Sequence, residues 1–265
     1  MKGIRRVLAP NPGMMTGPGT NTYLVGEREI AVIDPGPAIA SHLDAIQAQA
    51  GAPITQIWLT HAHPDHATAV PALREATGAV LMAWPTPNPT YAIPSLPTPD
   101  RALADGDDIT LDGEHYQALH CPGHASDHLC FFRPADGALF TGDVVVGLGT
   151  VVIAPPDGDL TQYLASLARL LTLHATVILP GHGEPITHPD AKLREYIDHR
   201  LAREVQVLGG LERGLTTVAA LVADIYAAVD PRVHPVAAQQ VLGHLFKLVR
   251  EGKVARDGDM WRQVP

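Results

Sequence analysis

Short apolar segments with strand character alternate along most of the chain with segments that have the period of a helix. Strands are predicted from apolar or β-branched runs between turn signals, and helices from apolar residues that recur every 3.6 positions. The predicted strands are 21–25, 29–33, 54–59, 79–84, 109–111, 115–120, 128–132, 138–141 and 176–179. The predicted helices in the same region are 38–50, 67–77, 159–173 and 189–208. This order indicates an α/β chain.

A glycine-rich stretch then interrupts the pattern. Gly209, Gly210 and Gly214 predict a hinge, because glycine ends helices and permits tight turns. We therefore expect a large domain over residues 1–208 and a small domain over residues 209–265.

The small domain has its own order of elements. We expect helices over 216–229 and 235–251, followed by a hairpin over 253–264 around an Asp-Gly-Asp turn. Helix, helix and hairpin is the outline of a winged helix, although three-helix versions are usual and no clean helix-turn-helix signature is present.

Composition restricts the class of protein. The apolar runs are shorter than the roughly 18 to 20 residues that a membrane-spanning helix needs, so we expect no membrane span. Near the start, Pro10, Pro12 and Gly13 arrive before an apolar segment could form, so no secretory signal is expected. Cys121 and Cys130 are expected to be buried side chains rather than a disulfide, which is typical of the reducing cytoplasm.

The charge of the chain opposes a purely electrostatic grip on nucleic acid. The net charge is −9, whereas Lys and Arg supply most of the affinity for phosphates. The acidic excess lies in the large domain, because residues 210–265 carry seven Lys and Arg against six Asp and Glu.

Segment 60–66 reads Thr-His-Ala-His-Pro-Asp-His and follows an apolar strand. The proline suits a turn or a first helical turn, so the cluster is expected where a strand ends. There His61 and His63 can point to one side and Asp65 and His66 to another, which could serve two metal ions. Imidazole and carboxylate groups suit Zn²⁺. The alternative interpretation is a polar turn whose histidines cap the next helix.

Three later strands end in a similar way, with a glycine and then a residue that can bind metal. The glycine lets the backbone bend sharply beside a site. These segments are Cys121-Pro122-Gly123-His124, Thr141-Gly142-Asp143 and Pro180-Gly181-His182-Gly183. We expect their His and Asp residues to complete the metal site.

The pattern resembles the five-motif signature of the metallo-β-lactamase superfamily. The residues that carry the resemblance are His61-x-His63-x-Asp65-His66, His124, Asp143 and His182. Further features resemble the β-lactamase-like protein 2 group, namely Asn11-Pro12-Gly13, Gly19 to Val25, Gly181-His182-Gly183, Tyr196-Ile197-x-His199-Arg200 and the tail Leu248 to Val254. This resemblance implies an αββα four-layer sandwich with a winged-helix-like C-terminal domain.

The resemblance also implies a binuclear centre. One metal would be held by His61, His63 and His124, the other by Asp65, His66 and His182, with Asp143 between them. The expected cofactors are two Zn²⁺ ions, with manganese and iron as alternatives. A hydroxide shared by the ions would be the nucleophile at neutral pH, and Asp65 would orient it or accept its proton.

Four residues outside this set are candidates for supporting or substrate-binding roles. Asp34 precedes a Pro-Gly turn, where a carboxylate accepts hydrogen bonds from loop N–H groups or orients a ligand histidine. His128 is expected to be a hydrogen-bond partner rather than a further ligand. His199 and Arg200 lie on a predicted helix, and we expect ion-pairing surface or interface residues there, with substrate binding as the alternative.

The sequence leaves three hypotheses for the function. The resemblance and the winged-helix-like tail favour an endoribonuclease acting on single-stranded RNA. The acidic charge and the small number of aromatic residues favour a hydrolase of thioesters, lactones or β-lactams. An inactive metal-bound scaffold is the third. The tail could shape the substrate site or form a homodimer.

Some loop features bear on the pocket. The proline-rich segment 85–99 is predicted to be a wall near the site or an insert, and segment 144–153 could line the pocket. Cys121 replaces a usual Thr of the family and could contact a metal, and Ala67-Thr68-Ala69 stands where small glycines are frequent.

Overall fold

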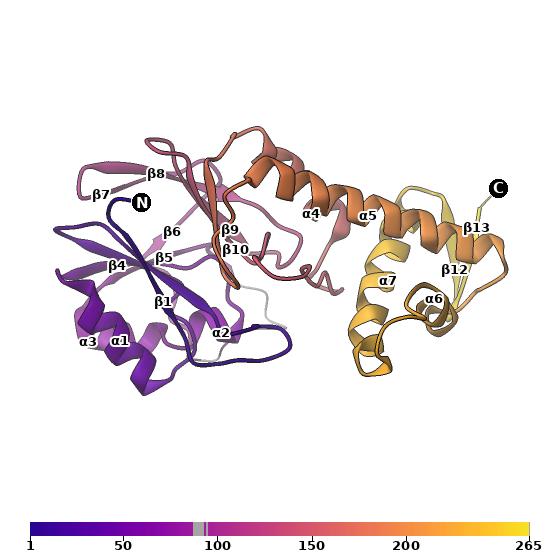
Figure 1. Cartoon of the computed structure of the whole chain (residues 1–265), viewed down its shortest axis with the longest axis horizontal. Helices are drawn as coiled ribbons and strands as arrows, with labels where there is room; N and C mark the ends of the chain where they lie inside the picture. The colour runs from indigo at the N-terminus through magenta and orange to yellow at the C-terminus, as the bar shows by residue number, and fades with distance from the viewer. Residues whose placement is uncertain (87–92, 94, 265) are drawn as a thin grey trace.

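The computed structural model of the chain describes residues 1–86, 93 and 95–264. Within these residues two β-sheets pack face to face, and helices cover both outer faces (Figure 1). The predicted αββα order is confirmed. The prediction for the proline-rich segment 85–99 falls largely on residues 87–92 and 94, which lie outside the described residues.

The first sheet is mixed, with parallel strands in one half and antiparallel strands in the other. Its strands, in spatial order, are β1 (Ile4–Leu8), β2 (Asn21–Val25), β3 (Ile30–Ile33), β4 (Ile54–Trp58), β5 (Val80–Ala83) and β6 (Arg101–Ala102). Strands β3 to β6 run parallel, whereas β1, β2 and β3 are antiparallel neighbours. The sequence pattern did not predict the edge strands β1 and β6.

Three short helices belong to this half: α1 (Ala40–Ala50), α2 (Pro64–Ala67) and α3 (Val70–Thr77). The prediction of one helix over 67–77 was wrong at its start, because α2 ends before α3 begins. Pro71 lies in the first turn of α3, where its missing N–H costs nothing, but it could not continue a helix from Ala67.

The second sheet has the spatial order β11-β10-β9-β8-β7. Its strands are β7 (Asp108–Leu111), β8 (Glu114–His120), β9 (Leu129–Arg133), β10 (Ala138–Gly142) and β11 (Val177–Pro180). Helices α4 (Leu160–Leu171) and α5 (Pro189–Glu212) pack on its outer face. Asp159 caps α4 by accepting hydrogen bonds from the N–H groups of Thr161 and Gln162.

Side chains of the first sheet alternate between two apolar cores. Tyr23 and Trp58 point into the core between the sheets, whereas Leu24 and Ile57 point into the core under α1 and α3. This alternation follows from the two-residue period of a strand. Strand β3 is buried on both faces and apolar throughout, whereas the edge strands β1 and β6 carry arginines.

The strand directions bring four chain segments to one edge. Strands β8 and β10 are both antiparallel to β9, and β11 is parallel to β10, so β8, β10 and β11 end on the same side. The loops after these strands meet the loop after β4. This convergence places the predicted ligand segments together.

The C-terminal part matches the winged-helix prediction. It contains α6 (Val218–Ile225), the 3-10 turn η1 (Pro231–Val233), α7 (His234–Arg250) and the hairpin of β12 (Val254–Asp257) and β13 (Met260–Gln263). Thr217 caps α6 by accepting a hydrogen bond from the Ala220 N–H. A separate apolar core around Leu221, Leu245 and Trp261 holds these elements together.

Helix α5 crosses from the sandwich to this C-terminal part (Figure 1). The predicted helix end and hinge at Gly209-Gly210 were wrong, because α5 continues through both glycines to Glu212. A side chain at Gly210 would place its Cβ 2.5 Å from Leu221 Cδ2, so glycine here permits close packing of α5 against α6. The domain boundary between 208 and 209 stays a prediction.

No helix that the structure describes combines the length and apolar character required to cross a membrane.

Candidate metal centre

The loop after β4 carries four polar side chains in the order that the sequence indicated. His61 and His63 lie in the loop itself, and Asp65 and His66 lie in the first turn of α2, which Pro64 begins. Pro is favourable at the first helical position because no intrahelical partner is needed for its nitrogen. The short helix places the His66 ring beside His61, with ring centroids 4.4 Å apart, and Asp65 beside His182.

Three other strand ends supply the remaining residues. His124 follows β8, Asp143 follows β10 directly, and His182 lies two residues after β11. A Cβ on Gly181 would lie 2.6 Å from Asp143 Oδ1, so the glycine lets the β11 loop approach this carboxylate closely. The structure brings all seven predicted residues together. They are called the His/Asp cluster below: His61, His63, Asp65, His66, His124, Asp143 and His182.

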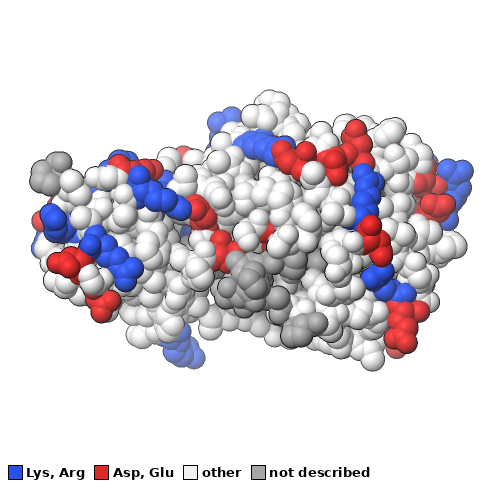
Figure 2. All heavy atoms as spheres, turned by 180° about the vertical axis from the view of Figure 1, so that it is seen from behind, with Lys and Arg blue, Asp and Glu red and all other residues white. Residues whose placement is uncertain are grey.

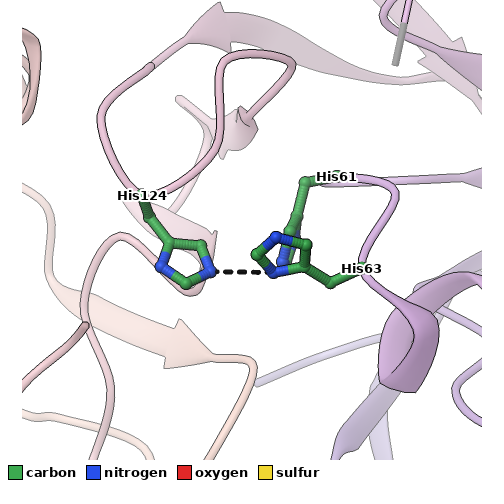
Figure 3. A group of neighbouring side chains, drawn as sticks. All are labelled: His61, His63 and His124. Carbon is green, nitrogen blue, oxygen red and sulfur yellow. Dashed lines mark hydrogen bonds between the residues drawn. The ribbon is translucent and has the colours of Figure 1, made fainter. Parts of the chain in front are cut away.

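The cluster divides into overlapping groups of three, each with its candidate ligand atoms within 4.8 Å of one another. The groups are His61, His63 and His124; His61, His66 and Asp143; and Asp65, His66 and His182. In the first, His63 Nδ1 lies 3.0 Å from His124 Nε2, and the rings approach from opposite sides of the site with His61 behind them (Figure 3). In the third, His182 Nε2 lies 3.2 Å from Asp65 Oδ2.

Asp143 lies between the two ends of the cluster. Its Oδ2 is 3.4 Å from His182 Nε2 and 3.7 Å from His124 Nε2, and its Oδ1 is 3.5 Å from His66 Nε2. One carboxylate therefore faces both the group that contains His124 and the group that contains His182.

Hydrogen bonds on the outer side of the rings fix their orientation. In each case the Nδ1 atom contacts an oxygen and leaves Nε2 directed at the cluster. The pairs are His61 with Thr60 Oγ1 at 2.9 Å, His66 with Asp34 Oδ2 at 2.8 Å, His124 with the Val152 carbonyl at 2.9 Å and His182 with the Gly19 carbonyl at 3.2 Å. Such outer partners set the tautomer and aim of metal-binding histidines.

Asp34 and His128 lie directly behind the cluster. Asp34 accepts hydrogen bonds from the N–H and hydroxyl of Thr60 at 2.8 and 2.7 Å, besides its contact with His66. It has a φ of +51°, which Asp tolerates in turns. The Nε2 atom of His128 accepts a hydrogen bond from the Asp143 N–H at 3.1 Å, and its ring stacks on His61.

The titration behaviour differs between the two ends of the cluster. Burial lowers the pKa of His61 well below its usual value and that of His63 to about 4, so both rings are neutral and keep a lone pair. Burial opposes charge on His66 as well, but Asp65, Asp143 and Asp34 outweigh it and raise the pKa of His66 well above its usual value.

The pKa of His182 is raised like that of His66, whereas the pKa of Asp65 is lowered. Although burial lowers it, the pKa of His182 rises to about 9 because of Asp143 and Asp65. Burial raises the pKa of Asp65, but His66 and His182 lower it to about 2. This end therefore holds protons that a bound cation would displace.

The residues fit a metal. Three buried atoms at the centre have no hydrogen-bond partner among the described residues, namely His61 Nε2, His66 Nε2 and Asp143 Oδ1. A buried polar atom without a partner costs about 1–3 kcal/mol. Cations at this place would satisfy all three atoms, and imidazole and carboxylate donors suit zinc, manganese and iron.

A cavity of about 640 Å³ opens from the cluster toward the C-terminal part. Its lining includes His63, Asp65, His124, Asp143 and His182 at the cluster, and Tyr226, Val229, Val233 and Val236 from the C-terminal part. The segment 146–152 lines it from the side, as the sequence suggested for 144–153.

His199 and Arg200 both line this cavity from α5. Arg200 is buried and donates to Gln240 Oε1 at 2.7 Å and to the Val151 carbonyl, so it joins α5, α7 and the 146–152 segment. The side chain of Cys121 packs in the core against α4.

Sequence reasoning missed two supporting residues. Asp127 is buried and accepts a hydrogen bond from the Ala62 N–H at 3.0 Å, which holds the loop between His61 and His63. The hydroxyl of Thr20 donates to Asp65 Oδ2 at 3.3 Å. Asp127 lies between His124 and His128, and Thr20 lies in the Gly19 to Val25 segment that carries the subgroup resemblance, so both positions offered a signal.

Two family models match the chain. The model of the metallo-β-lactamase superfamily matches residues 15–182, and that of the β-lactamase-associated winged helix domain matches residues 217–261.

Curated relatives match over nearly the whole length. The chain is 36% identical over 266 residues to the β-lactamase-like protein 2 homologue of Drosophila melanogaster, covering 95% of this chain and 89% of that protein. It is 35% identical over 265 residues to an atrochrysone carboxyl ACP thioesterase of Aspergillus chevalieri, covering 95% and 82%.

Solved structures share the fold. A metallo-β-lactamase family protein from Thermus thermophilus superposes with a TM-score of 0.82 at 23% identity, covering 100% of this chain and 99% of that one. A second structure, solved in a di-iron-bound form, has a TM-score of 0.58 at 34% identity and covers 70% of this chain and 96% of that one.

Proposed function

The chain belongs to the metallo-β-lactamase superfamily and is a metal-dependent hydrolase, and from that premise we propose that it is a binuclear enzyme that hydrolyses small esters or thioesters. The observation that carries the binuclear part is the position of Asp143 within 3.4 to 3.7 Å of His182 and His124, at both ends of the His/Asp cluster.

The proposed metal ligands are the side-chain nitrogen and oxygen atoms that point toward the centre of the His/Asp cluster. His61 Nε2, His63 Nδ1 and His124 Nε2 would hold one ion, and Asp65, His66 and His182 the other, with Asp143 bridging. Zinc is the preferred metal because neutral imidazole with carboxylate is its usual donor set. Iron is the competing assignment, since a relative of known structure was solved in a di-iron-bound form.

When bound, two such ions would supply a shared hydroxide at neutral pH and a Lewis acid for the scissile carbonyl. Asp65 would orient the attacking water or accept its proton. Orientation has the stronger support, because its carboxylate is partly exposed to the cavity and its pKa of about 2 keeps it ionised but makes it a weak base. The Thr20 hydroxyl and His182 hold the carboxylate in place.

The cavity supports a small organic substrate. Its walls between the cluster and α7 are formed mainly by apolar side chains, including Val146, Leu148, Val151, Val233 and Val236. An apolar wall stabilises an acyl chain by burial. One relative is named as a thioesterase, which agrees with this assignment.

Single-stranded RNA is the second candidate substrate. The cavity lining includes the cation Arg203 and the aromatic ring of Tyr226, which could stack a base. The surface gives this candidate less support, because acidic and basic side chains alternate on the face in Figure 2 instead of forming a basic band.

The test combines metal content and substrate range. We expect about two equivalents of zinc per chain, and thioester hydrolysis that is lost on chelation and restored by zinc. A His63→Ala variant should lose metal and activity, whereas the exposed control His115→Ala should keep both. A single iron per chain with full activity would contradict the binuclear zinc assignment.

Substrate class is decided with the same preparations. A small thioester, a lactone, a chromogenic cephalosporin and single-stranded RNA are compared with and without chelator. Metal-dependent cleavage of RNA without thioester or lactone hydrolysis would replace the ester assignment by the second candidate. RNA cleavage that persists after chelation would indicate a contaminating nuclease.

Two further predictions come from the sequence. A homodimer is tested by light scattering of the purified chain, and a cytoplasmic location by fractionation of the source cells.

A further inference from the structure

Where α5 lines the cavity, the wall carries basic and polar side chains. His199, Arg200 and Arg203 line the cavity from α5, and Tyr226 lines it from the end of α6. Residues three and four positions apart on a helix lie on the same face, so the three side chains reach the cavity together.

Arg200 is already used by the fold. Its guanidinium donates to Gln240 and to the Val151 carbonyl, and the side chain is buried. Both acceptors are neutral, so these contacts hold the walls of the cavity together but leave the positive charge without a counter-ion among the described residues.

Arg203 is different, because its guanidinium lies over an aromatic ring. Its Cζ is 4.3 Å from the centre of the Tyr226 ring, and its Nε is buried without a hydrogen-bond partner among the described residues. In the part of the chain that the structure describes, no carboxylate pairs with it, whereas neighbouring Lys247 pairs with Glu204 and Glu251. The Nη groups of Arg203 are not among the buried atoms and make no hydrogen bond with the described residues, so these groups, and not Nε, can bind a ligand in the cavity.

His199 adds a second polar group beside it. Its Nδ1 is buried and has no partner among the described residues. Burial, with Arg200 and Arg203 nearby, lowers the pKa of His199, so the ring is neutral and can donate one hydrogen bond.

We propose that Arg203 and His199, with Tyr226 holding the guanidinium in place, form a subsite for an oxyanion of the substrate. The ligand class is a carboxylate or phosphate on the same molecule as the carbonyl that is hydrolysed at the His/Asp cluster. A planar guanidinium with several donors matches both groups. The assignment rests on the proposed ester or thioester hydrolysis.

The oxyanion could belong to either side of the scissile bond. A carboxylate would lie at the end of the acyl chain, and a phosphate would lie in a phosphopantetheine leaving group. Three thioesters separate these sources: butyryl-N-acetylcysteamine is neutral, glutaryl-N-acetylcysteamine adds an acyl carboxylate, and butyryl-coenzyme A adds leaving-group phosphates.

The experiment compares kcat/KM for the three thioesters in wild type, Arg203→Gln and Arg203→Lys. Arg194→Gln is the matched control, because Arg194 is an exposed residue of the same helix. In Arg203→Gln we expect kcat/KM for one anionic thioester, relative to the neutral one, to fall by about 10- to 100-fold. Arg203→Lys should fall less, and the control should keep the wild-type ratio. The substrate whose ratio falls identifies the source of the oxyanion.

Unchanged ratios for both anionic thioesters in Arg203→Gln would overturn the subsite. An equal fall of the ratio in Arg194→Gln would also overturn it, because the effect would then be long-range charge.

Failure of the proposed function can be recognised separately. If the wild type hydrolyses none of the thioesters, the ester assignment fails, and calorimetric titration of the metal-loaded protein with glutarate and with pantetheine 4′-phosphate decides the subsite. Binding that is at least tenfold weaker in Arg203→Gln than in Arg194→Gln supports it. Equal binding by the two variants, or no binding by wild type, rejects it.

Discussion

Asp143 lies between the two ends of the His/Asp cluster, in the position proposed for the bridging ligand. Its two oxygens face His66, His124 and His182 at 3.4 to 3.7 Å, and its own N–H is held by His128. A group that bridges two cations contributes to the affinity of both. Removal of the Asp143 carboxylate should therefore reduce metal affinity more than removal of a histidine that belongs to one group.

We expect Asp143→Ala to lower the metal content from about two equivalents to below one and to reduce kcat/KM by more than the roughly 10- to 100-fold loss typical of outer partners. Metal analysis and steady-state kinetics measure the two effects. Asp44→Ala, in an exposed position of α1, is the control. An Asp143→Ala protein that retains two equivalents would refute a bridging role.

His244 is a buried histidine that the proposed chemistry does not use. Neither ring nitrogen has a hydrogen-bond partner among the described residues, and burial, together with Arg200 and Arg203, lowers its pKa to about 3. In the unfolded chain the His244 imidazole takes up a proton near pH 6.5, whereas in the folded protein it does so only near pH 3. The free energy of unfolding therefore falls as the pH decreases below 6.5.

The size of the effect follows from linkage. At pH 5.5 the His244 imidazole is protonated in the unfolded chain but not in the folded protein, and this difference lowers the free energy of unfolding by about 1.4 kcal/mol. We expect the decrease in unfolding free energy between pH 7.5 and 5.5 to be about 1 kcal/mol smaller in His244→Leu than in wild type, as measured by urea denaturation. His115→Leu, at an exposed position, should show the wild-type decrease. Equal decreases in all three proteins would show that His244 does not destabilise the fold in acid.

At the scale of elements, α5 shows packing prevailing over local propensity. Two consecutive glycines weaken a helix by roughly 1 kcal/mol each, yet α5 runs through Gly209 and Gly210 to Glu212. Only Gly210 faces α6, where a Cβ would come 2.5 Å from Leu221 Cδ2. Gly209 meets only the flexible end of Arg213 at 3.4 Å.

The two glycines should therefore respond differently to alanine. Gly209→Ala should raise the free energy of unfolding by about 0.5 kcal/mol through helix propensity. Gly210→Ala should lower it by about 1–2 kcal/mol, because the buried Leu221 must shift in a packed core. Chemical denaturation monitored by circular dichroism gives both values. Equal stabilisation by both substitutions would show that α5 and α6 do not need a glycine at their contact.

At the scale of the molecule, the C-terminal part completes the wall of the cavity. Gln240 on α7 accepts from Arg200 at 2.7 Å and donates to the Val151 carbonyl at 2.9 Å, so one amide joins three segments. Because α7 is used in this way, its cavity side is not available to enter a nucleic-acid groove as in many winged helices.

Removal of the Gln240 amide should loosen the wall. We expect Gln240→Ala to lower the free energy of unfolding by about 2 kcal/mol, because the buried Arg200 loses a hydrogen-bond acceptor, and to raise KM for the substrate that wild type hydrolyses. Urea denaturation and kinetics test this. The neighbouring Gln239→Ala should change stability by less than about 0.5 kcal/mol. Similar values for the two variants would refute the joining role of Gln240.

The sequence by itself determined the fold class and the membership of the His/Asp cluster. These features are local, because apolar periodicity defines each strand and helix, and the ligand-type residues follow directly where strands end. The superfamily resemblance added the αββα order and the winged-helix domain, both of which are confirmed. The metal-binding roles of the seven residues stay predictions.

Only the tertiary structure decided the contacts that give the site its shape. His182 contacts a backbone carbonyl at Gly19, and Arg203 faces Tyr226 inside the cavity. Helix α5 likewise continues through Gly210 because α6 packs there. In each case the contacting group lies outside the local segment or is a backbone atom. Such a group leaves no local pattern of residue types from which the contact could be predicted. Such contacts exist only after the strands and helices have packed.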